Sequence, residues 1–454
     1  MLDQSFSPKN LLQLMKPWES RRFRIRGGLP AIQAAASDIV GRINDGTFTF
    51  EGVNCRRTKK SFLYSSNSMG TVLVQRKLNE NFRRIYKVRQ SNRRNIVSQI
   101  HSLLCEPVPK HIIKLDISSF YESISRESVI RKIVRQGPMS LDTKIMIDSL
   151  FSSPIFADTS GLPRGVGLSA SISEYYMRDF DKMVTRMTGV YFYCRYVDDI
   201  LVFCYKNPDL IRSNIISLLK REGLDINEAK SPPPMSVLDC LCETTCKCGG
   251  RCQCHQKCSC AAALSDHISV ENFNPMLQVG SRFDHHILDY LGYRFAFPPL
   301  NMRKAKNLVT ITISPKKLEK IKSRIVLTIK RYLIEKDFPL LRDRLRFLMS
   351  NYRVGWRGNS AINAGIFYNY SNLTISRNDG GSNSAILSLD DFVKYMLNRS
   401  DYRFQLSSLL TRRQRRQIFG MSFKHGYQYR RLYKFSRKKM QRIKEAWRYE
   451  YNNL

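Results

Sequence analysis

Short apolar, β-branched runs alternate along the chain with longer segments whose apolar residues recur at helical spacing. The first kind predicts buried strands and the second predicts helices. Strands are expected at 112–117, 190–193, 200–204 and 288–295. Helices are expected at 77–104, 126–135 and 168–187. Alternation of the two indicates an α/β or α+β layer with helices on one face of a sheet.

The C-terminal third has a helical and basic pattern. Ser314 can cap a helix with Pro315 in its first turn, and the Ser7-Pro8 pair gives the same signal near the N-terminus. Apolar residues keep helical spacing at 318, 321, 325 and 329. A loop is expected near 370–384, and the segment 232–264 interrupts the pattern as an insertion.

Composition adds a strong charge to this picture. The 454 residues carry 75 Lys and Arg against 38 Asp and Glu, a formal charge of +37. Hydrophobic residues make up 43%, which excludes wholesale disorder, and the length suggests two to four packed units. Such an excess of cations favours a phosphate backbone as partner, with an anionic membrane surface as the alternative.

We find no spanning apolar run, signal peptide or lipidation motif, so no membrane partner is expected, and the protein is predicted to be soluble and cytoplasmic.

Acidic residues are concentrated at one point of this basic chain. Asp198 and Asp199 lie side by side between two strand-like runs, and Asp116 ends another run. An isolated Asp-Asp pair is usually a solvated turn between strands. A second strand-borne acid changes that interpretation, because paired carboxylates supply the hard oxygen ligands that Mg²⁺ prefers. Two Mg²⁺ ions at such a site can activate a hydroxyl and neutralise a triphosphate.

Five segments around these acids occur in a characteristic order. They are Asp116 with Phe120-Tyr121, Gly161 to Ser171, Tyr196 to Asp199, Gly223 to Lys230, and Leu291 to Tyr293. In that order they resemble the palm motifs of reverse transcriptases. Arg164 stands where many relatives have Gln, which leaves template contacts there open.

The resemblance implies roles for the acidic residues and one lysine. Asp116 and Asp198 would be the main ligands of the Mg²⁺ ions, joined by the Ile117 carbonyl. Asp199 would bind metal or stabilise the site from its edge. Lys230 would be a general acid toward pyrophosphate. For Lys230 the alternative is an ordinary solvated surface lysine.

The resemblance also implies nucleotide and primer contacts. Tyr121 lies at the position of the steric gate that excludes a ribose 2′-hydroxyl, although core packing would explain it equally well. Gly165 would let the backbone approach template and nucleotide closely. Lys87 and Arg94 are candidates for gripping the triphosphate, against the alternative of a generic nucleic-acid-facing helix. The expected primer grip is Leu291, Gly292 and Tyr293.

The implied fold is α+β, a right-hand polymerase with fingers, a ferredoxin-like palm, a helical thumb and a basic C-terminal extension. The expected domains are fingers with the N-terminal region (1–105), palm (106–300) with its Cys-rich insertion (232–264), thumb (301–370) and extension (371–454). Over 411–454 the extension carries fourteen Lys and Arg against two Glu, interleaved with aromatic residues. That combination suits structured or single-stranded RNA, and the alternative is a solvated tail with nonspecific affinity.

Eight of the 12 cysteines follow a strict C-x-C rhythm inside the insertion. They are Cys240, Cys242, Cys246, Cys248, Cys252, Cys254, Cys258 and Cys260. Four thiolates make a closed zinc site, so eight are expected to hold Zn²⁺, with a redox-sensing loop as the alternative. The position of the cluster predicts a structural or partner-binding role.

Within the family, residues 1–7 and 117–124 resemble bacterial defence-associated reverse transcriptases, nearest to the first subunit of the type-three systems. This implies an antiviral role, a structured non-coding RNA as template, dNTPs and a DNA product, and a second reverse transcriptase subunit in the bacterial cytoplasm. A higher-order oligomer is a further expectation. Two alternatives stay open: a retron-like or group II-intron-like enzyme, and an inactive RNA-binding scaffold.

Overall fold

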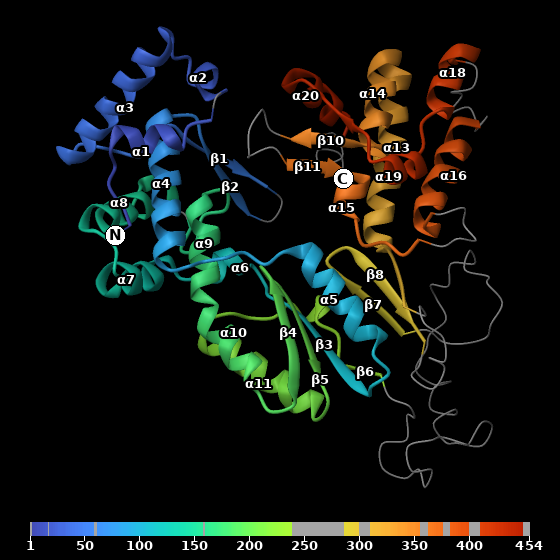
Figure 1. Cartoon of the computed structure of the whole chain (residues 1–454), viewed down its shortest axis with the longest axis horizontal. Coiled ribbons are helices and arrows are strands. Elements are labelled where there is room, and N and C mark those ends of the chain that lie inside the picture. Colours follow the sequence, from blue (N-terminus) through green and yellow to red (C-terminus); the bar gives the residue numbers. More distant parts are fainter. Residues whose placement is uncertain are drawn as a thin grey trace. The chain divides into compact units, whose positions relative to one another are not determined.

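The computed structural model describes most of the chain as two compact units (Figure 1). The described residues are 2–16, 18–58, 61–157, 159–237, 286–298, 309–354, 362–375, 382–398 and 409–447. The first unit consists of Met1–Asn92 and Pro109–Val237, and the second of Arg93–Val108 and Leu238–Leu454. The predicted four-part division into fingers, palm, thumb and extension stays a prediction.

The first unit combines a four-stranded sheet, a two-stranded hairpin and surrounding helices. Its helices are α1 (Pro8–Gln13), α2 (Glu19–Arg22), α3 (Gly28–Asn44), α4 (Met69–Ile85), α6 (Phe120–Ser123), α7 (Arg126–Gln136), α8 (Leu141–Phe151), η1 (Pro154–Phe156), α9 (Gly167–Tyr176), α10 (Arg178–Thr185), α11 (Pro208–Arg221) and η2 (Glu228–Lys230). Its strands are β1 (Val53–Arg57), β2 (Phe62–Ser66), β3 (Lys110–Asp116), β4 (Val190–Tyr196), β5 (Asp199–Cys204) and β6 (Met235–Val237).

The four-stranded sheet has the order β4-β5-β3-β6, and all neighbours are antiparallel. Helix α10 packs against β4 and α11 against β3 (Figure 1). Strands β3 and β5 are buried almost throughout, as their continuous apolar runs require, and join the main core of the unit. Three of the four expected strands are therefore present close to their predicted bounds.

Helix α4 organises the rest of the first unit. It packs against α1, α8 and α9, and buries residues along one face from Leu73 to Phe82. Helix α1 begins as expected, because the Ser7 hydroxyl accepts a hydrogen bond from the amide of Asn10 and Pro8 occupies the first turn.

The second unit combines two three-stranded sheets with helices. Its helices are α5 (Arg93–Cys105), α13 (Pro315–Glu335), α14 (Phe338–Met349), α15 (Ile366–Asn369), α16 (Ser384–Asn398), α18 (Arg412–Phe419), α19 (Phe423–Tyr429) and α20 (Arg437–Glu445). Its strands are β7 (His286–Tyr290), β8 (Tyr293–Phe297), β9 (Thr310–Ile313), β10 (Asn351–Val354), β11 (Ile362–Gly365) and β12 (Leu432–Tyr433). The sheet orders are β7-β8-β9 and β11-β10-β12.

The basic C-terminal segment folds onto α13 and α14. Trp447 donates from its indole nitrogen to the Arg324 carbonyl at 3.2 Å, and Phe347 of α14 stacks on Tyr352 with ring centroids 4.0 Å apart. Phe435 and Ile443 join this cluster. Many aromatic residues of the segment thus belong to a core, which is the physical reason they recur among the cations.

Three predicted elements differ from the structure. The helix expected over 77–104 is two helices, α4 and α5, because the chain leaves α4 at Tyr86 and Lys87 has a left-handed φ of 50°. The helix expected over 168–187 is interrupted at Met177, where ψ is −5°. The strand expected over 288–295 is the hairpin β7–β8, whose turn has positive φ at Leu291 and Gly292. At Met177 and at the β7–β8 turn the apolar pattern continues through the break, so periodicity alone does not reveal it. Between α4 and α5, by contrast, residues 87–95 include Val88 as their single apolar residue.

Helix α19 lies against the end of α14 at a contact that only glycine permits. A Cβ at Gly426 would lie 1.8 Å from the Met349 carbonyl oxygen. We expect Gly426→Ala to destabilise the second unit by about 3 kcal/mol, because backbone has to move. Gly41→Ala is the control, since a Cβ on that residue of α3 meets nothing within 4 Å and should stabilise by about 0.5–1 kcal/mol. Urea unfolding of both variants measures the difference, and equal midpoints would contradict the packing argument.

Candidate active site

Three aspartates converge at one end of the four-stranded sheet. Asp116 is the last residue of β3 and pairs with Asp199, the first residue of β5. Asp198 lies in the turn between β4 and β5, and its carbonyl accepts a hydrogen bond from the Ile117 amide at 3.0 Å. The sheet pairing therefore brings together residues 82 and 83 positions apart in the chain, and the expected proximity of Asp116 to the Asp198-Asp199 tip is present.

The turn that carries Asp198 has an unusual backbone. Tyr196 pairs with Asp199, which leaves Val197 and Asp198 as the two turn residues. Val197 has φ 60°, a left-handed value that β-branched residues rarely adopt. The surrounding structure has to hold this conformation, because it costs about 1–2 kcal/mol.

Arg195 holds the turn from inside the protein. Its side chain is buried and donates to the Val197 carbonyl at 3.0 Å. The same guanidinium makes a two-pronged contact with Asp181 of α10, both distances 2.8 Å, and reaches Glu174 of α9 at 2.9 Å. Tyr193 donates its hydroxyl to Asp181 at 2.6 Å. The turn is thereby tied to two helices through one cation.

The pKa of Arg195 reflects this network. Burial opposes its charged form, but the hydrogen bonds and charges of Asp181 and Glu174 outweigh burial and raise the pKa. Arg195 is therefore a permanent cation under the turn.

Burial and mutual repulsion act on the aspartates themselves. Burial, followed by the charge of Asp116, raises the pKa of Asp198. Burial, followed by the charges of Asp198 and Asp116, raises the pKa of Asp199 to about 6. These carboxylates are therefore short of positive charge, although they belong to a strongly basic chain.

Lys230 forms an ion pair with Asp116. Its ammonium nitrogen lies 2.7 Å from Asp116 Oδ1, and this hydrogen bond raises the pKa of Lys230. The backbone around Asp116 is also fixed, because its amide donates to the Ser231 hydroxyl at 3.0 Å and its carbonyl accepts from Asn227 at 2.7 Å. Lys230 is thus in contact with the acidic cluster while its side chain is 49% exposed, and its role as a general acid stays a prediction.

The donor chemistry of the site fits a divalent cation. Three carboxylates and the Ile117 carbonyl are hard oxygen ligands, and the raised pKa values indicate negative charge that lacks compensation. Within the described ranges, however, no group of three or more His, Cys, Asp or Glu side chains is already arranged to hold a metal. The Lys230–Asp116 ion pair accounts for one carboxylate oxygen.

Tyr121 and Gly165 lie on segments that meet beside this site. The Leu162 amide donates to the Tyr121 carbonyl at 2.8 Å, and the Arg164 guanidinium lies 5.4 Å from the Tyr121 ring centroid. Arg164 also forms a two-pronged ion pair with Glu122 at 2.6 and 2.9 Å. Burial raises the pKa of Tyr121.

Gly165 has φ 96°, and a Cβ there would lie 2.1 Å from the Tyr64 carbonyl oxygen. The close approach that the structure displays at Gly165 is therefore to β2. A role toward template and nucleotide stays a prediction.

The expected primer-grip residues form the β7–β8 turn of the second unit. Arg93 of α5 donates to the Leu291 carbonyl at 2.6 and 3.0 Å and lies over the Tyr293 ring at 5.0 Å. Gly292 has φ 79°. Arg94 also belongs to the second unit, whereas Lys87 belongs to the first, and no contact with a phosphate group tests either residue.

The cysteines from Cys240 to Cys260 lie outside the described residues. Binding of Zn²⁺ by them stays a prediction.

The motifs did not point to Arg195, Asp181 or Glu174 as parts of the aspartate site, nor to Arg93 as the support of the β7–β8 turn in the second unit. Arg195 precedes the acidic segment directly, so its position was visible, but its partners lie on helices 14 and 21 residues earlier. An arginine within an apolar strand run, directly before two acids, is the sequence signal that indicates such a network.

The family comparison covers half of the chain. Residues 69–295 match the model of the reverse transcriptase (RNA-dependent DNA polymerase) family. The matched segment contains all three aspartates and Lys230. The chain therefore belongs to the reverse transcriptase family, a class of RNA-directed DNA polymerases that act as nucleotidyltransferases.

One solved structure is similar to the chain at low sequence identity. A structure of telomerase from Candida albicans, in complex with a TWJ fragment of telomeric RNA, has a TM-score of 0.31 and 10% sequence identity. The match covers 88% of this chain and 62% of that chain, so this chain spans less than two thirds of the telomerase length. No curated protein matches the sequence. None of the described helices has the length and apolar character needed to cross a bilayer.

The Arg195 network predicts a separation of rate from stability. Arg195→Lys keeps the charge but loses the fork that joins Asp181, Glu174 and the turn. We expect primer extension to slow by about tenfold or more, because a 1 Å shift of a catalytic group has effects of that order or larger. Single-turnover extension on a supplied primer–template measures it.

Arg76→Lys is the matched control for this prediction. Arg76 makes the same kind of fork with buried Glu19 at 2.6 and 2.7 Å, and its remaining hydrogen bond goes to Leu14. It should lose similar stability with little effect on the rate. Equal slowing of both variants would show that Arg195 acts only on stability.

Proposed function

We propose that the chain copies RNA into DNA with the Asp116–Asp198–Asp199 cluster as its catalytic centre. The observation that supports this most directly is the sheet register that pairs Asp116 with Asp199 beside the Asp198 turn. Together with membership of the reverse transcriptase family, this cluster is the natural site for nucleotidyl transfer.

The carboxylates and the Ile117 carbonyl would hold two Mg²⁺ ions. When bound, such ions lower the pKa of a primer hydroxyl and neutralise the triphosphate. Asp116 and Asp198 would be the principal ligands, with Asp199 at the edge. Lys230, whose raised pKa keeps it protonated, would leave Asp116 and protonate pyrophosphate. Arg195 would fix Asp198 relative to β3.

Nucleotide and primer contacts extend this proposal. The Tyr121 ring, held beside Arg164, would close the site to a ribose 2′-hydroxyl. Lys87, Arg94 and Gly165 would contact nucleotide or template. Leu291, Gly292 and Tyr293 would position the primer end, with Arg93 supporting their turn.

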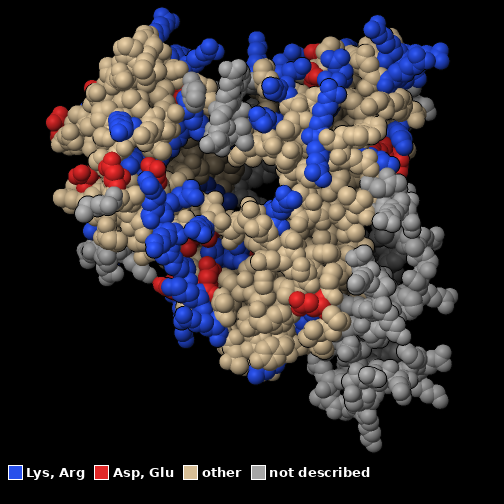
Figure 2. Space-filling view, viewed as in Figure 1, with Lys and Arg blue, Asp and Glu red and all other residues tan. Residues whose placement is uncertain are grey.

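The biological setting is part of the same proposal. We infer a bacterial antiviral system in which a structured non-coding RNA serves as template, and a second reverse transcriptase subunit assembles with this chain, in a larger oligomer if more copies join. The resemblance of residues 1–7 and 117–124 supports this inference, as does the excess of Lys and Arg, which outnumber the acids on the face in Figure 2. A cytoplasmic location and Zn²⁺ binding by the cysteine cluster complete it.

Replacement of one carboxylate tests the catalytic centre. Asp198→Asn keeps the size of the side chain but removes its charge. We expect DNA synthesis with Mg²⁺ and labelled dNTPs to fall by at least about a hundredfold, since metal-held charge contributes several kcal/mol. RNA binding should change little. Asp209→Asn, at an exposed position in the first turn of α11, is the control and should keep full activity, whereas Asp198→Asn with full activity would reject the proposed centre.

The sugar-selecting role of Tyr121 has its own test. Tyr121→Val opens space beside the nucleotide, so discrimination against ribonucleotides should fall about tenfold to a hundredfold. Tyr121→Phe keeps the ring and should keep the discrimination. The measurement is the ratio of kcat/KM for dNTP and rNTP on one primer–template. Unchanged discrimination in both variants would assign Tyr121 to packing alone.

A further inference from the structure

The basic C-terminal segment uses only part of its aromatic content in the core. Phe423 and Tyr427 are 0% and 3% exposed, and the Tyr427 hydroxyl donates to the Tyr370 carbonyl at 3.1 Å. Tyr429 is different, with 74% of its surface exposed. Its ring contacts the His425 ring, with centroids 5.5 Å apart, and most of its surface stays available to a partner.

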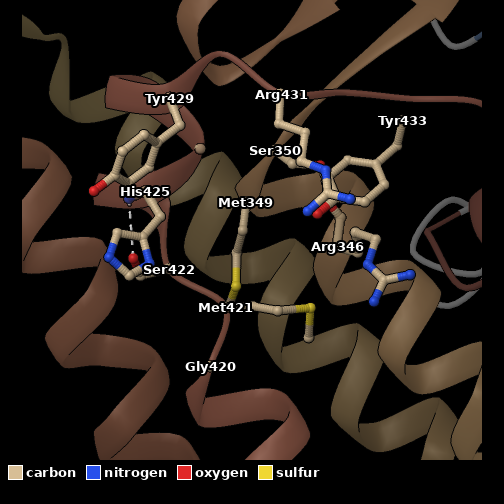
Figure 3. A pocket seen from close by; sticks show the side chains of 11 residues that line it. Arg346, Met349, Ser350, Gly420, Met421, Ser422, His425, Tyr429, Arg431 and Tyr433 are labelled. Carbon is tan, nitrogen blue, oxygen red and sulfur yellow. Dashed lines mark hydrogen bonds between the residues drawn. The ribbon is translucent and has the colours of Figure 1, made fainter.

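Tyr429 borders a cleft of about 550 Å³ within the second unit (Figure 3). The lining residues come from the end of α14, from the α18–α19 connection, from α19 and from the segment that enters β12. They are Arg346, Met349, Ser350, Gly420, Met421, Ser422, His425, Gly426, Tyr429, Arg431 and Tyr433. The volume lies in the range of small-ligand sites, where one nucleotide fits.

The cleft has polar and aromatic side chains on two sides and methionine side chains between them. Figure 3 shows His425 and Tyr429 together on one side, and Arg346, Arg431 and Tyr433 on the other. Met349 and Met421 lie between the two groups. Flat rings suit the faces of a base, and methionine side chains adapt to its shape.

The charge of the cleft is positive. None of the residues that line it is acidic. The guanidinium carbons of Arg346 and Arg431 lie 5.0 and 5.4 Å from the Tyr433 ring centroid. Two cations stacked on one ring provide a site for a phosphate group next to a base.

Arg346 keeps unused hydrogen-bonding capacity. Its Nε is buried and has no hydrogen-bond partner among the described residues. Its contact with Asp343 is long, at 3.9 Å, and Lys439 takes the other Asp343 oxygen at 2.5 Å. The terminal guanidinium nitrogens, whose contact with Asp343 is this long one, are the atoms of Arg346 that an acceptor entering the cleft would pair with.

The walls of the cleft are held in place before any ligand arrives. Gly426 lies against the Met349 carbonyl, and Asn351 donates to the Gly426 carbonyl at 2.6 Å. The Ser422 hydroxyl caps α19 by accepting from the His425 amide at 3.0 Å. A site whose walls are fixed loses less entropy on binding.

We propose that this cleft binds one unpaired nucleotide of an RNA strand. The base lies between the Tyr429 and His425 side and the methionines, and its phosphate lies at Arg346 and Arg431. The proposal rests on the proposed function in one respect, that RNA is the polymer this enzyme holds. It adds a site, separate from the aspartates, that anchors a single-stranded part of that RNA.

Binding of a labelled, unstructured RNA 12-mer to the full chain tests the proposal by fluorescence anisotropy at several salt concentrations. Tyr429→Ala should weaken binding about tenfold, because stacking on one ring contributes that much. Arg431→Gln should weaken it and reduce the slope of log Kd against log salt by about one.

Tyr395→Ala on α16 and Arg413→Gln on α18 are exposed controls outside the cleft and should have smaller effects. Equal effects of cleft and control variants would overturn the site.

Cross-linking of the unmodified chain provides a second measurement that does not depend on the folding of a variant. RNA with 4-thiouridine should cross-link to Tyr429 or Tyr433, and mass spectrometry locates the adduct. An adduct confined to other segments would overturn the proposal. Competition by free ATP as effective as by RNA would assign the cleft to a mononucleotide, and competition by polyglutamate would assign it to an acidic peptide; either result would overturn the RNA-strand site.

The experiment also separates this proposal from the proposed function. Asp198→Asn should retain the cross-link and the anisotropy change, because the cleft does not include the aspartates. An unmodified chain that binds and cross-links RNA at Tyr429 but extends no primer would leave the cleft in place and reject the polymerase proposal. Primer extension on a supplied duplex without any cross-link at Tyr429 would support the polymerase proposal and overturn the cleft.

Discussion

Repulsion among carboxylates is the constraint around which the first unit is built. Asp116, Asp198 and Asp199 would separate in a flexible chain, yet the register of β3 and β5 holds them at one end of a sheet. Burial and mutual repulsion together raise the pKa of Asp199 to about 6. Strand pairing, the buried core behind it and the Lys230 ion pair compensate this cost.

The Arg195 network fixes the position of the turn that carries Asp198. One buried guanidinium joins the turn at Val197 to α9 and α10, so the acidic tip is tied to both helices. Breaking such a buried pair by removing one partner commonly costs about 3–5 kcal/mol. The acidic residues that compensate Arg195, Asp181 and Glu174, are therefore as much a part of the site as the three aspartates at the end of the sheet.

In the second unit, basic and aromatic residues of the C-terminal segment serve two different purposes. Basic and aromatic residues of the C-terminal segment form a core with α13 and α14, where Trp447, Phe435 and Phe347 meet. Only a subset, around Tyr429 and Tyr433, remains to face a cleft. Interleaved cations and rings in a sequence therefore do not by themselves indicate how many rings are available to RNA.

The sequence by itself determined the strands β3, β4 and β5, the acids at their ends and the ordered motifs of a reverse transcriptase, because continuous apolar runs and local spacing encode these features. It did not reveal the β7–β8 hairpin, because the apolar run continues across that turn. The break between α4 and α5 was missed although residues 87–95 include a single apolar residue, Val88. Only the tertiary structure decided which distant side chains serve the site. Asp181 and Glu174 carry no local signal, and their roles arise from helices packed against a turn, a long-range contact that hydrophobic pattern and spacing do not specify.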